Sequence, residues 1–586
     1  MELGFILNLQ KYDVWLAVLA AFALAIVLTW PVILSPADLL VGHPGNDIWN
    51  HVWGYWWVAD AIAQGHWPTN AELLAYPNGG TLYFIDTMQV IFSLPVQWIF
   101  GPEVAYNTVV IVQLALCGLA AWLLSRQLTG DSIAAGMSLI IFGAAPHILG
   151  QAYNGISETV CAGWVPLTLW ALLRNIKNPN LKNSAILGFS AGICVLTSWY
   201  YGLFAALSSA LIVAWYAFKH AWLVDWTKMI RWTALALSIA LGLVIGPFLS
   251  FQQSLSASDA IVTRDPQFVE NSLLNHNITD VLSLVNPTTV PSPDLFSLYG
   301  EELIIVIYLG WIAMVLSAYG LWATRPRDQV YMWFGLALVF LIFSLGPYLN
   351  VGGDYVLIQG KKIPLPFLPL YKAFPIFDRI SHPFRFVTVV SLSLSVLSAY
   401  GFRALMRRKA PLFQSAVLGG LVFAVLLEVH WFSPAAIPIP ASSSAIPEAY
   451  QEMRTDPESG AVLDLPLTIP NLERAVYVWY QKEHKRPIPW GLNDPMPRSL
   501  INNYLSMTLI RMEATHAQSL APILPELELV IAARTLARSG YRYIVVHDQF
   551  YPDFKAEQVH TLLQALFGEA KHYPEDQLHV YTVELL

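Results

Sequence analysis

Asp47 is the residue of this sequence that is best placed to do chemistry. It lies in the run Gly45-Asn-Asp-Ile-Trp-Asn-His, just beyond the first long apolar segment, and His51 follows one helical turn later. A carboxylate in such a place can act as a general base towards a hydroxyl group if its surroundings adjust its pKa. The alternative is that Asp47 only caps a helix. The pattern makes Asp47 our candidate catalytic base and His51 a candidate substrate contact.

The segment around Asp47 is acidic and rich in tryptophan, and from Asp13 to Glu103 it contains no lysine or arginine. Its acidic residues and tryptophans include Asp38, Asp47, Asp60, Glu72, Asp86, Trp49, Trp53, Trp56, Trp57 and Trp67. Aromatic faces beside a carboxylate suit a site that stacks a sugar ring, and Trp53 is our candidate for that contact. The alternative is that the tryptophans form the aromatic belt found at membrane surfaces.

A second group of polar residues lies in a short loop between two apolar segments. Its members are His147, Tyr153, Asn154 and Glu158. Polar groups this close to the end of a membrane span are often functional, although Ser157 and Glu158 could simply start the next helix. We predict Glu158 as a second catalytic carboxylate and the other three as substrate contacts. Asp47 and Glu158 could hold a divalent metal ion or work without one, so no cofactor is assigned.

Positive charge that could bind a phosphate is concentrated in a later loop. This loop contains Lys361, Lys362, Lys372, Arg379 and Arg385. The planar fork of arginine binds two phosphate oxygens at once, and Arg385 directly precedes an apolar segment, at the depth where the phosphate of a lipid would lie. Arg379, Arg385 and Lys372 are therefore candidate ligands of a lipid phosphate. The alternative is ordinary contact with lipid headgroups by side chains that snorkel.

The composition indicates that these residues are positioned by a multi-pass helical membrane protein. Apolar residues make up 56% of the chain and charged residues 12%, whereas soluble domains have roughly a quarter charged residues. Apolar runs long enough to cross about 30 Å of hydrocarbon predict eleven spans. They lie near residues 13–34, 103–126, 132–150, 158–174, 184–200, 201–218, 230–250, 302–322, 329–347, 386–405 and 412–432. The shorter apolar stretch 87–100, which contains Pro95, is predicted to lie along the interface.

The basic residues predict the orientation of these spans, because loops rich in lysine and arginine stay in the cytoplasm. Such clusters fall on alternate loops, at Lys11, Arg126, Arg174, Lys177, Lys182, Lys219, Lys228, Arg231, Arg325, Arg327, Arg403, Arg407, Arg408 and Lys409. The N-terminus is then cytoplasmic, and the outer loops are 35–102, 150–157, 251–301 and 348–385. We expect a protein of the inner cell membrane whose C-terminal part faces outward.

A change in composition near residue 433 predicts a separate C-terminal domain. The last 154 residues hold 30 of the 72 charged side chains. Residues 433–447 are rich in proline and serine and are predicted as an extended linker. Residues 448–586 are predicted to form an α/β domain, with strands at 461–467, 541–547 and 578–583 and helices at 526–539 and 556–567. The transmembrane catalytic domain would then span residues 1–432.

Two further features exclude classes of protein. The net charge is −8 and the basic residues form short clusters, so nucleic acid is not an expected partner. The three cysteines, Cys117, Cys161 and Cys194, lie inside apolar runs, so we expect no disulfide framework. There is also no internal repeat and no glycine motif of the kind that binds nucleotides.

Taken together, these residues and their order resemble the GT-C glycosyltransferases. The resemblance rests on Asp47 after the first span, the long first outer loop, the basic loop before a late span and the outer C-terminal domain. The segments Tyr76-Pro-Asn-Gly, Arg379-Ile-Ser-His-Pro-Phe-Arg-Phe and Tyr480-Gln-Lys-Glu-His-Lys-Arg-Pro-Ile look like a bacterial branch that includes YfhO-type proteins. The first loop departs from the pattern because it lacks the paired Asp-Glu of better-known members.

The resemblance implies an activity and roles for residues. Members transfer a sugar from a polyprenyl-phosphate donor to a glycan, lipid or protein acceptor at the extracytoplasmic face. By analogy Asp47 would be the base, Glu158 a second carboxylate of the site, and Arg379 or Arg385 a ligand of the donor phosphate. The other partner that we expect is membrane lipid itself.

Two alternative functions belong to other classes. A transporter or flippase of lipid-linked envelope material would want charged or broken helices near the middle of the membrane and often a repeat. The ionisable residues of this chain are mostly in loops, which favours chemistry at the surface. A non-catalytic scaffold that recruits envelope partners would tolerate the loss of Asp47.

Overall fold

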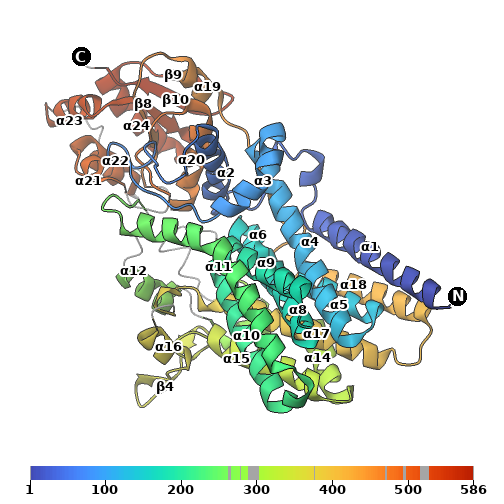
Figure 1. The fold of residues 1–586 in the computed structure, drawn as a ribbon. Coiled ribbons are helices and arrows are strands. Elements are labelled where there is room, and N and C mark those ends of the chain that lie inside the picture. The colour runs from blue at the N-terminus through green and yellow to red at the C-terminus, as the bar shows by residue number, and fades with distance from the viewer. Residues whose placement is uncertain are drawn as a thin grey trace.

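A bundle of apolar helices with a smaller α/β domain at one end makes up the structure (Figure 1). The computed structural model describes residues 2–261, 266–276, 279–287, 303–374, 377–468, 471–492, 496–514 and 527–584. The N-terminus lies at the end of α1 that points away from the α/β domain (Figure 1). The bundle therefore has two different ends, and only one of them carries the C-terminal domain.

Each predicted span corresponds to one helix or to a pair of helices. They are α1 (Glu2–Leu28), α4 (Pro102–Thr129), α5 (Ser132–Gly143) with α6 (Pro146–Tyr153), α7 (Ser157–Val160) with α8 (Trp164–Lys177), α9 (Leu181–Thr197), α10 (Trp199–Lys219), α11 (Trp226–Ser256), α14 (Trp311–Ala323), α15 (Asp328–Ser344), α17 (Val387–Leu405) and α18 (Pro411–Phe432). Six helical segments of the described chain are long and apolar enough to cross a membrane. The prediction of a multi-pass helical membrane fold is confirmed, and the count of eleven spans stays a prediction.

Three predicted spans are not continuous helices. The first, 132–150, breaks before Pro146, because proline lacks an N–H and disfavours helical geometry at the residue before it. The second, 158–174, is interrupted by the 3-10 turn η2 (Cys161–Gly163). In the third, 302–322, residues 303–310 are not helical and the helix begins at Trp311, while residue 302 lies outside the described chain. Such irregular backbone persists in a bundle only where other groups satisfy its hydrogen bonds.

The predicted first outer loop contains two helices that lie beside each other, α2 (Ile48–Ala63) and α3 (Thr87–Phe100). Helix α3 is 14 residues long and includes Pro95. Its apolar side chains Phe92, Trp98, Ile99 and Phe100 are exposed. A short helix with an uncovered apolar face suits the predicted position along the membrane interface.

Close packing of small residues holds the centre of the bundle. Helices α14 and α17 touch through Gly320 and Gly401, and a Cβ atom added at Gly401 would lie 2.1 Å from the backbone oxygen of Leu316. Small residues at helix contacts allow such an approach where water is absent. This contact fixes α17, which directly follows the turn that carries Arg385.

The C-terminal domain has the α/β character that the sequence predicts. Its sheet contains β7 (Ala461–Leu465), β8 (Tyr541–His547), β9 (Lys571–Tyr573) and β10 (Leu578–Thr582) in the order β7-β8-β10-β9. Strands β7 and β8 are parallel, and the other pairs are antiparallel. The helices are α19 (Glu448–Thr455), α20 (Asn471–His484), α21 (Arg498–Ile501), α22 (Tyr504–Ala514), α23 (Leu527–Arg538) and α24 (Asp553–Phe567). The predicted helix 526–539 matches α23, except that Glu526 lies outside the described residues.

The predicted linker joins the C-terminal domain to the first outer loop. It is extended, but its residues form strand β6 (Ala441–Ser443), which pairs antiparallel with β1 (Leu39–Val41). The N–H of Gly42 also donates to the oxygen of Pro440 at 2.8 Å, and α2 packs against α20. The first loop and the C-terminal domain therefore lie at the same end of the bundle, as an odd number of spans requires.

Candidate active site

Asp47 stands where the chain enters α2, but its carboxylate does not cap the helix. It accepts a hydrogen bond from the side-chain amide of Asn50 at 2.7 Å, and no backbone N–H of α2 donates to it. The residue is half-buried. A carboxylate that is held by one side chain and still reachable from outside is suited to accept a proton from a substrate. The alternative interpretation as a helix cap does not describe this side chain.

A buried ion pair lies one turn along the same helix. His51 Nδ1 is 2.5 Å from Asp86 Oδ2, and Asp86 is completely buried. Ser157 donates to the same carboxylate, and Gln89 donates to its other oxygen at 2.6 Å. Burial by itself lowers the pKa of His51, but the negative charge of Asp86 and the hydrogen bond to it outweigh burial, and with the charges of Asp47 and Glu158 they raise this pKa to about 9. His51 is therefore a cation at neutral pH, among three carboxylates.

Asp86 is a residue of the site that the sequence interpretation missed. It was visible only as one of five acidic residues of the first loop, and its place before Thr87 looks like an ordinary helix start. In the structure its side chain makes no cap bond to α3 and faces His51 instead. One signal could have identified Asp86. The segment contains no lysine or arginine, so its acidic residues can pair only with a histidine such as His51.

Glu158 pairs with Arg385 at the other side of this group. Arg385 Nη1 lies 3.6 Å from Glu158 Oε1, and both side chains are more than nine-tenths buried. The guanidinium lies over the ring of Tyr200, 4.7 Å from its centre. Arg385 belongs to the 3-10 turn η7 (Pro383–Phe386) that leads into α17. The pair therefore joins the second outer loop to the start of a central helix.

Three polar atoms close to this pair are buried and make no hydrogen bond with any described residue. They are Arg385 Nε, the hydroxyl of Tyr200 and His147 Nε2. The other nitrogen of His147 lies 3.0 Å from the backbone oxygen of Val306, in the non-helical stretch before α14, and its ring packs against Phe384, which neighbours Arg385. Since buried polar groups are nearly always hydrogen-bonded, these atoms are candidates to bind a polar ligand. Sequence reasoning missed Tyr200 because it looks like any aromatic residue of a span.

Two of the predicted substrate contacts support the loop that carries Asp47. Asn154 accepts from Asn46 at 3.1 Å and bonds the backbone of Ile304 with both atoms of its amide. The ring of Tyr153 stacks on His43, with centres 5.1 Å apart. These contacts tie the first and second loops and the non-helical stretch before α14 together.

Three other predicted contacts lie elsewhere. Trp53 is completely buried, stacks on Trp57 and donates its indole N–H to Gln481 of the C-terminal domain at 2.9 Å. Arg379 and Lys372 are exposed on the fourth loop. The structure thus gathers Asp47, His51, His147, Glu158 and Arg385 at one end of the bundle and leaves these three outside that group.

The carboxylates of this group do not form a ready metal site. Within the described ranges, one group of three residues has ligand atoms within 4.8 Å of one another, and it consists of Asp548, His560 and His579 in the C-terminal domain. Asp47 and Glu158 belong to no such group. No catalytic step is therefore assigned to a metal ion here.

Comparison with solved structures reveals the same fold in membrane glycosyltransferases. The oligosaccharyltransferase of Archaeoglobus fulgidus in the apo form is 14% identical, with 95% of this chain and 72% of that chain covered and a TM-score of 0.53. The arabinofuranosyltransferase AftD from Mycobacteria is also 14% identical, with 97% and 40% covered and a TM-score of 0.55. The sequence matches no protein-family model and no curated relative. This likeness confirms the fold that the resemblance to GT-C glycosyltransferases implies, and the likeness to YfhO-type proteins stays a prediction.

Proposed function

We propose that this protein is a membrane glycosyltransferase, which moves a sugar from a polyprenyl-phosphate donor to an acceptor at the extracytoplasmic face. The observation that carries the proposal is the group of buried and half-buried charges at one end of an apolar bundle, made by Asp47, His51, Asp86, Glu158 and Arg385. The fold shared with two glycosyltransferases supports it. A transporter is less well supported, because this group is tied to the loops at one end of the bundle and not to a path through it.

Asp47 is the proposed general base. Its carboxylate takes the proton of an acceptor hydroxyl while the oxygen of that hydroxyl forms a bond to the anomeric carbon of the sugar. The bond from this carbon to the phosphate oxygen breaks, and the polyprenyl phosphate leaves with the electron pair. The side chain of His51 follows Asp47 by one helical turn, and the charges of the two residues interact. Bound by Asp86, His51 acts as a positioning residue.

Arg385 is the proposed anchor of the donor phosphate. Its Nε and the hydroxyl of Tyr200 are two buried donors that have no partner among the described residues. Nε2 of His147 is a buried acceptor beside them, because Nδ1 of that ring faces the carbonyl of Val306 and carries the proton. A phosphate can accept from the Nε of Arg385 and the hydroxyl of Tyr200, while the lipid tail follows the apolar bundle. Of the three cations predicted from the sequence for this role, Arg385 is supported by burial, whereas Arg379 and Lys372 are exposed.

The proposed reaction takes place outside the cytoplasm, because the basic clusters of the sequence favour a cytoplasmic N-terminus. The site lies at the end of the bundle that carries the C-terminal domain, opposite that N-terminus. The acceptor is a hydroxyl-bearing glycan or lipid or a protein side chain. A cell with an inner membrane and flipped lipid-linked sugars would supply the donor.

The test is Asp47→Asn in purified protein that is reconstituted into vesicles with a polyprenyl-phosphate sugar and a mixture of cell-envelope acceptors. The change removes the charge and keeps the shape, so the rate should fall by about 10² to 10⁴ if Asp47 is the general base. Asp60→Asn is the matched control, because Asp60 lies on the same helix but pairs with Lys485 at the surface. If Asp47→Asn transfers sugar at the parental rate, the assignment is wrong.

A further inference from the structure

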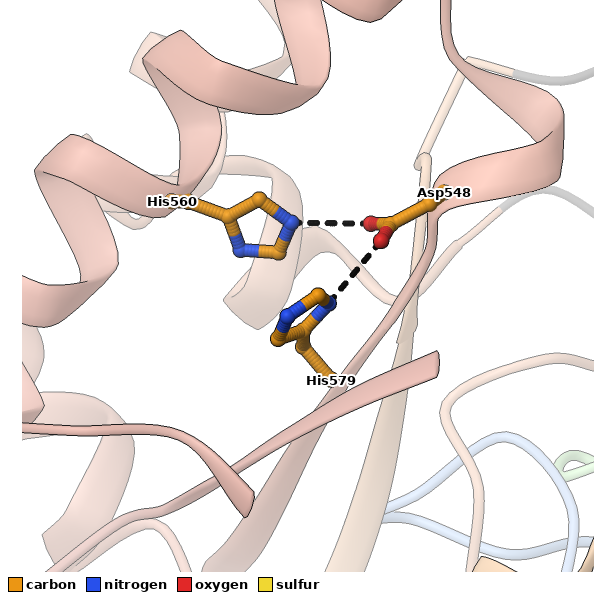
Figure 2. Close-up of side chains that lie close together, drawn as sticks. All are labelled: Asp548, His560 and His579. Atoms are coloured by element: carbon orange, nitrogen blue, oxygen red, sulfur yellow. Dashed lines mark hydrogen bonds and ion pairs between the residues drawn. The ribbon is translucent and has the colours of Figure 1, made fainter. Parts of the chain in front are cut away.

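A second cluster of polar side chains, drawn in Figure 2, consists of Asp548, His560 and His579 in the C-terminal domain. Asp548 begins the 3-10 turn η8 (Asp548–Phe550) directly after β8, His560 lies on α24, and His579 lies on β10. The nitrogen and oxygen atoms that they offer lie within 4.8 Å of one another. Three separate elements therefore bring potential ligands to one point, and the proposed function uses none of them.

The two imidazole rings approach the same carboxylate from two sides, as Figure 2 shows. His560 Nε2 lies 2.8 Å from Asp548 Oδ1, and His579 Nδ1 lies 2.9 Å from Asp548 Oδ2. His579 Nδ1 is buried, yet it makes no hydrogen bond within the part of the chain that the structure describes. Its contact with Asp548 is close but poorly aligned as a hydrogen bond, so this nitrogen can become a ligand in the tautomer that leaves it unprotonated.

Both rings are held in orientation by groups behind them. The Nδ1 atom of His560 lies 2.9 Å from the hydroxyl of Tyr581, so Nε2 is left to face the cluster. The ring of His579 stacks on His572 of the neighbouring strand, with centres 4.1 Å apart and planes 10° apart. Metal-binding histidines typically have a partner for the second nitrogen, and Tyr581 is that partner for His560. The cluster is therefore ordered in advance of any ion.

We propose that Asp548, His560 and His579 bind a divalent transition-metal ion, with Zn²⁺ as the best match, and that water completes its coordination. Two imidazoles and a carboxylate are a usual ligand set of zinc, whereas Mg²⁺ and Ca²⁺ prefer oxygen. The three side chains are 20 to 26% exposed, so an ion and its water have access. The bound ion ties α24, β10 and the end of β8 together and stabilises the C-terminal domain.

The distances are close to what this ion needs. With zinc bonds of about 2.0 to 2.1 Å, two ligand atoms in a tetrahedral site lie about 3.3 Å apart. The two contacts of the carboxylate are 2.8 and 2.9 Å long, so each has to lengthen by about 0.5 Å when the ion enters. Rotation of the Asp548 side chain at the surface of the domain can provide this change.

The experiment uses the full-length protein in detergent, purified with an affinity tag that contains no histidine and stripped with a chelator. Titration with Zn²⁺, monitored by calorimetry, should show that one ion binds tightly to each protein molecule. Titration with Co²⁺ should give the visible absorption bands of a low-symmetry site with nitrogen ligands. His560→Gln and His579→Gln should each weaken Zn²⁺ binding by at least 100-fold and remove these bands.

The matched control is His572→Gln, since His572 stacks on His579 but offers no atom to the cluster. This variant should still bind one Zn²⁺ ion. Its Zn²⁺ affinity should change by less than about 10-fold, because changes to residues behind the ligands usually cost about 10- to 100-fold and His572 only stacks on a ligand. Asp548→Asn keeps the shape of the side chain and serves as a second test if a histidine variant fails to fold. The proposal is overturned if the parent binds no Zn²⁺ at micromolar concentrations, or if the ligand variants bind it as tightly as the parent does.

Discussion

Replacing Arg385 by methionine should separate the two roles of this arginine, in stability and in binding. Arg385 and Glu158 are both buried, with 3.6 Å between Nη1 and Oε1. Removing one partner of a buried ion pair costs about 3 to 5 kcal/mol, because it leaves a charge without its counter-charge. Arg385→Met should therefore lower the thermal unfolding temperature of the protein in detergent clearly. Glu158→Gln combined with Arg385→Met leaves neither charge and should recover most of this loss.

Donor affinity should not recover with stability. A hydrogen bond to a charged group contributes about 1.5 to 3 kcal/mol, so loss of the phosphate contact should weaken binding of a polyprenyl monophosphate by about 10- to 150-fold. The assay is calorimetry with the purified parent, Arg385→Met and the double variant. Arg379→Met is the control, since Arg379 lies in the same loop but is exposed. If the double variant binds the lipid as tightly as the parent, Arg385 only stabilises Glu158 and the donor phosphate binds elsewhere.

Other predictions concern topology, pH and packing. Alkaline phosphatase, which is active only outside the cytoplasm, should be active when it is fused after Leu586. If this fusion is inactive and a cytoplasmic reporter at the same position is active, one span has been miscounted. The pKa of His51 is raised to about 9, so the stability from its pairing with Asp86 is fully present below pH 6.5 and is lost as pH rises through about 9. Unfolding temperatures should therefore fall more steeply between pH 7 and 10 in the parent than in His51→Gln, and equal slopes would contradict the ion pair. Gly401→Ala places a Cβ 2.1 Å from the oxygen of Leu316 and should lower the unfolding temperature, whereas Gly419→Ala, where a Cβ meets open space, should not.

What the sequence predicted well depends on local patterns. Hydropathy found the helices of the bundle, and the change in charge density near residue 433 found the C-terminal domain. The spacing of Asp47 and His51 predicted that they lie one helical turn apart, and the N–H of His51 donates to the backbone oxygen of Asp47 at 3.3 Å. These signals extend over one or two turns of a helix, so neighbours along the chain determine them.

What the sequence could not predict depends on contacts between distant segments. Asp86 reaches His51 only because α3 lies beside α2. Trp53 looked like a sugar platform until Gln481, which is 428 residues away, was seen to hold it. Tyr200 gains its possible role only under the guanidinium of Arg385. No local pattern distinguishes these residues from others of the same type.

The pairing of β1 with β6 has a consequence for the order in which the protein is completed during its synthesis. Asp47 follows β1 closely, and the partner strand emerges from the ribosome about 400 residues later, as the separation of Ser442 from Gly42 indicates. In the predicted topology, the segment after α18 has to cross the membrane, and until then the first loop has an open strand edge and no C-terminal domain to pack against. Closing so long a loop costs entropy before any contact is gained. The proposed catalytic carboxylate should therefore reach its final position only in the last stage of biogenesis, which would keep a partly made protein inactive.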